Sequence, residues 1–277
     1  MTPAGQDGAR AFGALGATRH AASIRAPIIE GWDHVTGVDG RWLHASSVAR
    51  AELTATRASL DLFDPASPAS TLRVTVEVAD AEVRVEASVT GADLDAGADT
   101  LNRVGQSFAL PADERFFGLG ERYVTVDHRG RRYECWVEEG GLGGGERAQA
   151  GPTNPYPNGP GMTHVPVPFV LSTRGYGLWI DTTSRSGFDL GAGSADAWRV
   201  YIAEPTLRYR VMVHDDPRAT LAHFTRLTGR ARAPAPWVFA PRRRVDHGSM
   251  VRGVPEEEAL RTRHVPTTAI DDATHFL

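Results

Sequence analysis

The fold of this chain is decided by the stretch Leu72-Arg73-Val74-Thr75-Val76-Glu77-Val78, which continues after a short break as Val83-Arg84-Val85-Glu86-Ala87-Ser88-Val89. In both halves apolar residues alternate with polar ones, and the break contains the turn-forming pair Asp80-Ala81. Successive side chains of a strand point to opposite faces, so a period of two indicates a strand with one buried face. The stretch therefore predicts an antiparallel hairpin.

The same alternation recurs along the chain before Pro217. Gly, Pro and Asp separate the alternating stretches, and no long helical period lies between them. Many short strands of this kind predict a mainly β protein built as an antiparallel β-sandwich. We expect this sandwich to cover residues 23–233, after a loose N-terminal tail of residues 1–22. The further strands are expected at Val165, Val167, Phe169 and Leu171, at Leu178 and Ile180, and at Leu207, Tyr209, Val211 and Val213.

A helix is expected directly after the last of these strands. Asp216 is a good N-cap residue, Pro217 suits the first helical position, and Gly229 is typical of the residue that ends a helix. The apolar residues at helical spacing, which we expect to form its packing face, are Leu221, Phe224 and Leu227.

Residues 234–277 have the pattern of a parallel β-α-β unit. Trp237–Ala240 is a short apolar run that predicts a strand, Pro255–Arg261 begins with proline and acids and predicts a helix, and Thr267–Ile270 is β-prone. We interpret this order as the truncated start of a (β/α)8 barrel. Such a barrel closes with eight strands, so most of its active site is expected to lie outside these residues.

The composition is that of an ordinary globular protein. The 277 residues are 41% hydrophobic and 23% charged, and the net charge of −4 provides no attraction for nucleic acid or for an anionic membrane. All 30 basic residues are arginine, but they are spread along the chain. The sequence has neither a signal peptide's continuous apolar stretch nor about 20 apolar residues in a row, so we expect a cytoplasmic protein.

No cofactor or metal is expected. Cys135 is the only cysteine and has no activating cation pattern around it, which favours a buried structural thiol. The glycine-rich run 140–145 is not followed by Lys and Ser or Thr, so it is not a phosphate loop. His214-Asp215-Asp216 is the only dense cluster of His and carboxylates, and a turn with a helix cap explains it.

Three segments resemble glycoside hydrolase family 31, the α-glucosidase and α-xylosidase family. Phe116-Phe117-Gly118-Leu119-Gly120-Glu121-Arg122 is similar to its F/Y-G-L-G-E-R/H signature, and the segment from Pro168 to Asp181 is similar to its P-F-x-x-S-x-x-G-Y-G-x-x-x-D segment. Phe224–Gly229 with Pro236-Trp237 is similar to the family's link into the barrel. The resemblance covers about residues 115–277, while residues 23–114 fit the family's galactose-mutarotase-like sandwich by pattern alone.

This resemblance implies the N-terminal part of a retaining α-glycosidase that acts on α-glucosides or related α-linked sugars. Such enzymes use a carboxylate nucleophile and a carboxyl acid/base about 5 Å apart. In the resembled family both are aspartates beyond the second barrel strand, so they would fall after Leu277. The resemblance thus implies no catalytic residue in this chain, no activity of the chain alone, an oligosaccharide or α-glycoside as substrate, and a downstream chain as a candidate partner that carries the rest of the barrel.

The resemblance also implies several substrate-binding residues. The family's second barrel strand ends in an aspartate that binds a sugar hydroxyl, which Asp272 matches best and Asp271 matches in the other register. The irregular segment Glu138–Met162 corresponds to a sandwich loop that reaches over the barrel mouth. Its polar candidates for the outer sugar subsite are Glu138, Glu139, Asn154 and Tyr156, and the alternative is that this loop only packs on the barrel rim.

Two groups of arginines allow two interpretations each. Arg129-Gly130-Arg131-Arg132 is similar to the sulfoquinovosidase branch, where cations suit an anionic sugar, but a solvated hairpin turn also explains it. Arg242–Arg244 either face the barrel site or pair with Glu256–Glu258. For the whole chain, the alternative to a glycosidase part is a non-catalytic carbohydrate-binding β-sandwich or a decayed gene fragment.

Overall fold

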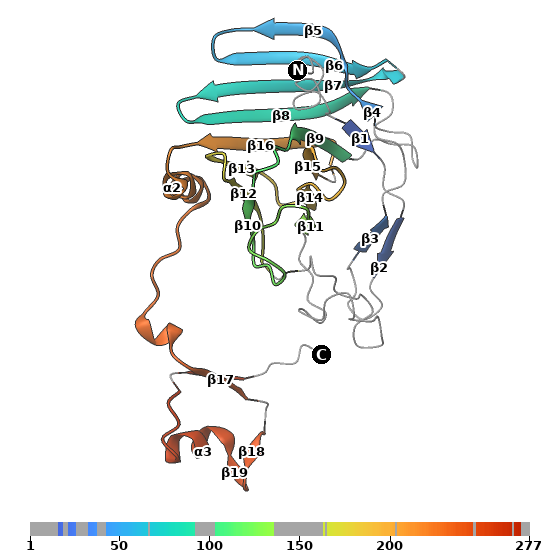
Figure 1. The fold of residues 1–277 in the computed structure, drawn as a ribbon. Helices are drawn as coiled ribbons and strands as arrows, with labels where there is room; N and C mark the ends of the chain where they lie inside the picture. The colour runs from blue at the N-terminus through green and yellow to red at the C-terminus, as the bar shows by residue number, and fades with distance from the viewer. Residues whose placement is uncertain are drawn as a thin grey trace. The chain divides into compact units, whose positions relative to one another are not determined.

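The computed structural model describes residues 16–18, 22–25, 33–37, 43–65, 67–91, 103–135, 163, 165–202, 204–245, 248–267 and 269–272. The chain divides into two compact units, Met1–Leu227 and Thr228–Leu277, and each is described by itself. The described residues contain mostly antiparallel strands and two α-helices, which confirms the predicted mainly β class (Figure 1). Neither of these helices is long and apolar enough to cross a membrane.

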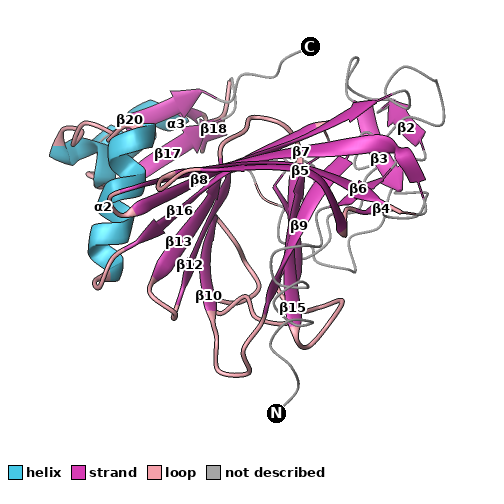
Figure 2. Cartoon of the chain, turned by 90° about the horizontal axis from the view of Figure 1, so that it is seen from above, coloured by secondary structure: helices cyan, strands magenta, loops and turns pink. Residues whose placement is uncertain are grey.

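The first unit is built from two antiparallel sheets that lie in separate layers (Figure 2). The larger sheet, in spatial order, consists of β10 (Phe116–Gly120), β12 (Pro166–Ser172), β13 (Tyr176–Ile180), β16 (Thr206–Val213), β8 (Glu82–Gly91), β7 (Ser67–Ala79), β6 (Arg57–Asp64) and β5 (Ser47–Leu53). The smaller sheet consists of β11 (Arg132–Cys135), β14 (Ser186–Asp189), β15 (Ala197–Ile202), β9 (Arg103–Ala109), β1 (Gly16–Thr18) and β4 (Leu43–His44). A separate hairpin joins β2 (Ala22–Arg25) to β3 (Asp33–Gly37).

The hairpin predicted from the alternating stretch is the β7–β8 pair. Val74 lies opposite Ala87 and Val76 opposite Val85, so the apolar residues of the two strands share a face. Asp80 has a φ of 47°, a left-handed conformation that Asp tolerates better than most residues. The strands expected around Phe169, Leu178 and Tyr209 are confirmed as β12, β13 and β16.

The core lies between the two sheets and is centred on aromatic side chains. Trp198 of β15 is 2% exposed, and its ring lies 4.5 Å from that of Phe108 and 5.1 Å from that of Phe116 on the opposite sheet. The Tyr209 hydroxyl of β16 donates to Gln106 of β9, which satisfies two buried polar groups across the same interface.

Part of the expected N-terminal tail belongs to the smaller sheet. β1 pairs with β9, with Ala17 opposite Val104, and on its other side with β4. The earlier residues, 1–15, lie outside the described part of the chain.

The predicted helix is α2 (Pro217–Thr228), and its ends are as expected. Asp216 Oδ1 accepts a hydrogen bond of 2.8 Å from the Arg218 amide, and Gly229 after the helix has a φ of 96°. The predicted packing face is wrong for two of its three residues, because Leu221 is 46% exposed and Leu227 is 39% exposed. Instead the helix buries Thr220 and His223.

The reason for the different helix face lies on the sheet below it. Gly177 of β13 has no side chain, and a Cβ placed there would lie 2.7 Å from Thr220 Cγ2, so the glycine lets the helix approach closely. Phe224 stacks on Phe169 with ring centres 4.2 Å apart, and His223 contacts Glu82 of β8. The apolar periodicity of the helix sequence contains no information about a glycine or a carboxylate on a strand that is distant in the chain, so it could not predict this face.

The second unit contains two strands that pair in parallel. β17 (Arg242–Val245) pairs with β20 (Ala269–Asp272), and α3 (Glu256–Thr262) lies between them in sequence, together with the short strands β18 (Met250–Val251) and β19 (Val254–Pro255). The predicted helix over Pro255–Arg261 is therefore confirmed to within one residue.

The first strand of this unit lies later than the sequence indicates. Trp237–Ala240 does not form a strand, because Pro236–Phe239 is a short 3₁₀ helix, η4. The fixed φ of Pro236 favours a helical first position, and the Val238 amide donates to Ala235 O at 3.0 Å. The strand begins only after Pro241, so Arg242, Arg243 and Arg244 form its first three residues and do not follow its end.

Candidate functional site

The turn at the end of β10 depends on two glycines. Gly118, Leu119 and Gly120 all have positive φ, at 117°, 65° and 78°. A Cβ on Gly118 would lie 2.6 Å from Phe169 O, and one on Gly120 would overlap Val165 O. The signature segment therefore serves to bring β10 close to β12, where the register of the pair shifts between Gly118 and Gly120.

Arg122, the last residue of the signature, connects this turn to β11. Its Nε donates to Leu119 O at 2.9 Å and its Nη2 donates to Glu134 O at 3.1 Å. The guanidinium also lies over the Tyr133 ring, 4.9 Å from its centre. Burial lowers the pKa of Arg122, but an arginine pKa is so high that the group stays charged. Sequence reasoning identified this residue as part of a motif and did not predict its contacts.

His128 contacts both the Gly118–Gly120 turn and Tyr133 of β11. Its Nε2 lies 3.0 Å from Gly118 O, which can only accept, so Nε2 carries the hydrogen and Nδ1 accepts from the Tyr133 hydroxyl at 3.1 Å. Burial lowers the pKa of His128, which favours this neutral form.

Cys135 ends β11 beside Arg122 and is buried. The predicted burial of this cysteine is confirmed, and burial raises the pKa of its thiol to about 11. The next described residue is Thr163, so Glu138, Glu139, Asn154 and Tyr156 lie outside the described residues. Their role in sugar binding stays a prediction.

The strand that leads into this segment is held by a polar network that the sequence did not reveal. Glu134 Oε2 accepts from Arg185 Nε at 3.0 Å, and Oε1 accepts from the Tyr201 hydroxyl. Arg103 lies over the Tyr201 ring, 5.2 Å from its centre. The Tyr201 ring occupies the space that a Cβ on Gly187 would need, so a glycine is required there. The sequence alone does not show that Gly187 is required, because the reason is the Tyr201 ring on the neighbouring strand.

The arginines at 129–132 lie in a turn between the two sheets, so the expected solvated hairpin turn is wrong: β10 pairs with β12 in the larger sheet and β11 pairs with β14 in the smaller one. Arg129 Nη1 donates to Pro111 O at 2.9 Å and to Glu114 O at 3.0 Å. Arg132 Nη2 contacts Asp189 Oδ2 at 2.6 Å, and this hydrogen bond raises the pKa of Arg132. Both side chains thus hold the turn to the rest of the sandwich.

A groove of about 680 Å³ opens beside the core of the sandwich. Its wall is mostly apolar, and its polar residues Gln106, Glu114 and Arg174 are already bonded to Tyr209, Tyr176 and Asp113. A sugar needs several hydrogen-bonding partners, so this groove is poorly suited to one. The groove residues include Leu60, Leu62, Val74, Val76, Val83, Phe108 and Trp198.

In the second unit, one arginine of β17 pairs with the first residue of α3. Arg243 Nε donates to Glu256 Oε1 at 2.6 Å and Ser249 Oγ donates to Oε2 at 2.6 Å. These bonds hold the pKa of Glu256 below its usual value, and the bond from Ser249 contributes most. Of the two interpretations of Arg242–Arg244, pairing with the acidic helix start is confirmed for Arg243.

Asp271 and Asp272 are the last two residues of β20. They lie opposite Arg244 and Val245 of the parallel strand β17. The carboxyl ends of parallel strands meet at one edge of a sheet, and ligands often bind at that edge. The backbone thus brings the two candidate aspartates to the expected edge, and their predicted sugar contact stays a prediction.

The chain is similar to known proteins of one family. A family model, "Glycosyl hydrolase 31 N-terminal galactose mutarotase-like domain", matches residues 46–189, so the chain belongs to this family. "Alpha-xylosidase XylQ" from Lactiplantibacillus pentosus is 29% identical over 139 residues, which are 50% of this chain and 16% of that protein. A sulfoquinovosidase from Agrobacterium fabrum is 32% identical over 99 residues, which are 34% of this chain and 15% of that protein.

A solved structure shows the same fold. It is a family 31 sulfoquinovosidase from E. rectale in complex with an aza-sugar inhibitor, with a TM-score of 0.67 and 20% identity, covering 95% of this chain and 37% of that one. The chain matches between 12% and 21% of the length of the curated relatives, so it corresponds to a minor part of each.

Proposed function

We propose that this chain is the N-terminal part of a retaining α-glycosidase that acts on α-glucosides or related α-linked sugars. The observation that carries the proposal is the family match over residues 46–189, together with named relatives that are α-xylosidases and sulfoquinovosidases. In this proposal the galactose-mutarotase-like sandwich domain consists of the expected residues 23–233 together with β1, and residues 234–277 begin the catalytic (β/α)8 barrel.

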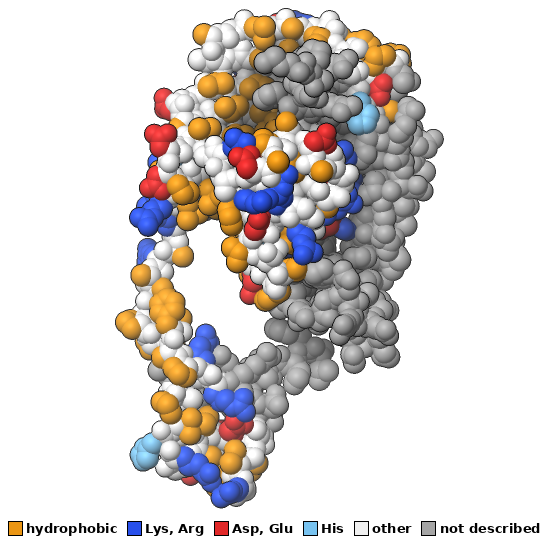
Figure 3. Space-filling view, viewed as in Figure 1, with side chains coloured by type: hydrophobic (Ala, Val, Ile, Leu, Met, Phe, Trp, Pro, Cys, Tyr) orange, Lys and Arg blue, Asp and Glu red, His pale blue; other side chains and the backbone are white. Residues whose placement is uncertain are grey.

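Two observations support the barrel part of the proposal. β17 and β20 pair in parallel with α3 between them in sequence, which is the repeating unit of such a barrel. Large hydrophobic side chains are also exposed in this unit, with Trp237 at 55%, Phe239 at 77% and Met250 at 62%. Figure 3 shows hydrophobic side chains, in orange, at the surface of this unit. In the proposed barrel the remaining strands and helices cover these side chains.

The chemistry of the proposed enzyme needs two carboxyl groups that flank the glycosidic bond. We assign neither of them to this chain. Its contribution is substrate binding: Asp272, or Asp271 in the other register, accepts hydrogen bonds from sugar hydroxyls, and Glu138, Glu139 and Tyr156 line an outer subsite. The residues 1–277 alone are therefore inactive, and an oligosaccharide or α-glycoside is turned over only when the remaining barrel strands are supplied, in the same chain or by a partner chain.

The test is a comparison of turnover on aryl α-glucosides and aryl α-xylosides. The purified 277-residue chain should give no hydrolysis above buffer, while a chimera that joins it to the remaining barrel of the L. pentosus α-xylosidase should hydrolyse at least one substrate. Circular dichroism establishes that the chimera is folded. A folded chimera without activity on any α-glycoside would favour the alternative of a non-catalytic carbohydrate-binding sandwich or a decayed fragment, and turnover by the chain alone would refute the assignment of catalytic groups.

A further inference from the structure

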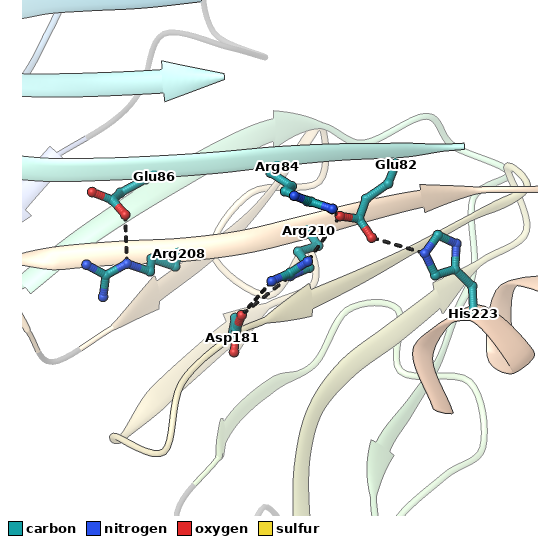
Figure 4. Close-up of polar contacts among 7 residues, drawn as sticks. All are labelled: Glu82, Arg84, Glu86, Asp181, Arg208, Arg210 and His223. Atoms are coloured by element: carbon teal, nitrogen blue, oxygen red, sulfur yellow. Dashed lines mark hydrogen bonds and ion pairs between the residues drawn. The ribbon is translucent and has the colours of Figure 1, made fainter. Parts of the chain in front are cut away.

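Two histidines and a glutamate form a hydrogen-bonded row between α2 and the larger sheet. His223 Nε2 lies 3.0 Å from Glu82 Oε2, a contact drawn in Figure 4, and His223 Nδ1 lies 3.0 Å from His214 Nε2. Glu82 is 5% exposed and His223 is 9% exposed, so water does not compete freely for either contact. We call Glu82, His223 and His214 the histidine latch.

The protonation state of Glu82 is determined by two arginines that point at its carboxylate (Figure 4). Arg84 donates to Oε1, and Arg210 Nη1 lies 3.1 Å from the same oxygen. Burial alone would raise the pKa of Glu82, but the arginines outweigh it and the pKa lies below its usual value. Glu82 is thus an ionised acceptor, and the hydrogen in its contact with His223 must sit on His223 Nε2.

The contact between the two histidine rings accommodates one hydrogen and no more. When both rings are neutral, His214 Nε2–H donates to the lone pair of His223 Nδ1. When one ring is cationic, a single hydrogen still lies between the two nitrogens. When both rings are cationic, two N–H groups and two positive charges face each other across 3.0 Å, and the hydrogen bond is replaced by repulsion.

The charged groups linked to the Glu82–His223 contact come from the larger sheet. Glu82 and Arg84 belong to β8, Arg210 belongs to β16, and Asp181 at the end of β13 lies 3.3 Å from Arg210 Nη2. Asp215 and Asp216 lie next to His214 in the chain and are exposed. Glu82 therefore already balances two arginines, and it is poorly placed to neutralise two added protons on the histidines as well.

We propose that the histidine latch is a pH-sensitive fastening of α2, which holds the helix on the sheet while the two rings share at most one added proton and loosens it when a second proton binds. The proposal is independent of the glycosidase assignment. The histidine latch acts on α2, which is the last element of the first unit before the chain passes into the second unit.

The experiment measures hydrogen exchange of the α2 amides in the full chain at about pH 7.5 and about pH 5, a range that spans ordinary histidine titration. After correction for the intrinsic pH dependence of exchange, we expect protection of these amides to fall by about tenfold or more at the lower pH, since a facing pair of charges is worth at least that factor. Amides of β7 should change much less. Unchanged α2 protection would overturn the proposal.

The matched variants are His214→Gln and His44→Gln. A glutamine amide at position 214 can still donate to His223 Nδ1 but takes up no proton, so this variant should keep its α2 protection at about pH 5. His44 is exposed on β4, and its replacement should leave the wild-type pH response intact. If His214→Gln responds to pH as the wild type does, the latch is wrong.

Should His214→Gln fail to fold, ring signals of the wild-type protein give a second test. The two rings should take up their protons one after the other, and α2 protection should fall only with the second uptake. Loss of protection with the first proton, or simultaneous uptake by both rings, would contradict the proposal.

Discussion

At the scale of single residues, the family signature is explained by backbone geometry. The turn Gly118-Leu119-Gly120 needs positive φ at each residue, and it is pressed against the backbone of β12. Arg122 and His128 then donate hydrogen bonds to the carbonyl oxygens of Leu119 and Gly118 in this turn. These contacts are structural, and they fix the end of β11 from which the chain enters the predicted substrate loop.

The glycine argument predicts different costs for two alanine substitutions. Gly130→Ala should cost about 1–2 kcal/mol of unfolding free energy, because its φ is 74° but no atom lies within 4 Å of the new Cβ. Gly120→Ala, at a φ of 78°, adds a clash with Val165 O and should cost about 1–3 kcal/mol more. Urea unfolding of both variants measures the difference. Equal costs would mean that the close approach of β10 and β12 is not required.

His128 predicts a pH dependence of stability. Its pKa in the fold lies below its usual value, so the neutral ring is favoured by folding and its stabilising effect is complete above about pH 6.5. That contribution is lost as the pH falls from there through the folded pKa. The unfolding free energy should therefore decrease more between about pH 7.5 and about pH 5.5 for the wild type than for His128→Gln. Parallel slopes would show that the ring is not held neutral.

At the scale of elements, the sequence predicts strands and helices well where one pattern acts alone. Alternation placed β7, β8, β12, β13 and β16, and cap residues placed α2. The sequence pattern gave a wrong result where residues distant in the chain determine the packing. An example is the buried face of α2, which is determined by Gly177 and Glu82 on the sheet. The sequence pattern also failed at Trp237–Ala240, where apolar character favours a strand but the flanking prolines give a 3₁₀ helix. The polar network at Glu134 carried no sequence signal at all.

The observed face of α2 predicts which of its side chains stabilise the fold. Phe224→Ala should lower the unfolding free energy by about 2–3 kcal/mol, because the ring stacks on Phe169 and meets Trp179 edge-on. Leu221→Ala should cost less than about 1 kcal/mol, because its side chain is 46% exposed. Urea unfolding of the two variants checks the order. A larger cost at Leu221 would restore the packing face that apolar periodicity predicts.

At the scale of the whole molecule, the two units differ in how well they cover their apolar residues. The sandwich encloses a core of aromatic and aliphatic side chains, whereas the second unit exposes Trp237, Phe239 and Met250. Removal of residues 236–277 should therefore raise the soluble yield of the sandwich, because an open parallel edge and exposed apolar side chains favour aggregation. Soluble yields of the two chains, expressed side by side, measure this. An equal or lower yield would indicate that the second unit contributes to the stability of the first.

The central claim, that this chain supplies part of a glycosidase active site, is tested most directly at the end of β20. In the chimera with a complete barrel, kcat/KM on an aryl α-glycoside is measured for the Asp272→Asn and Asp271→Asn variants. A carboxylate that accepts hydrogen bonds from a sugar contributes about 1.5–3 kcal/mol, so Asp272→Asn should lower kcat/KM by about tenfold to a hundredfold with the fold intact. Asp271→Asn should be milder, because adjacent strand residues point to opposite faces. Greater damage from Asp271→Asn would place the contact one residue earlier, and full activity of both variants would contradict the claim.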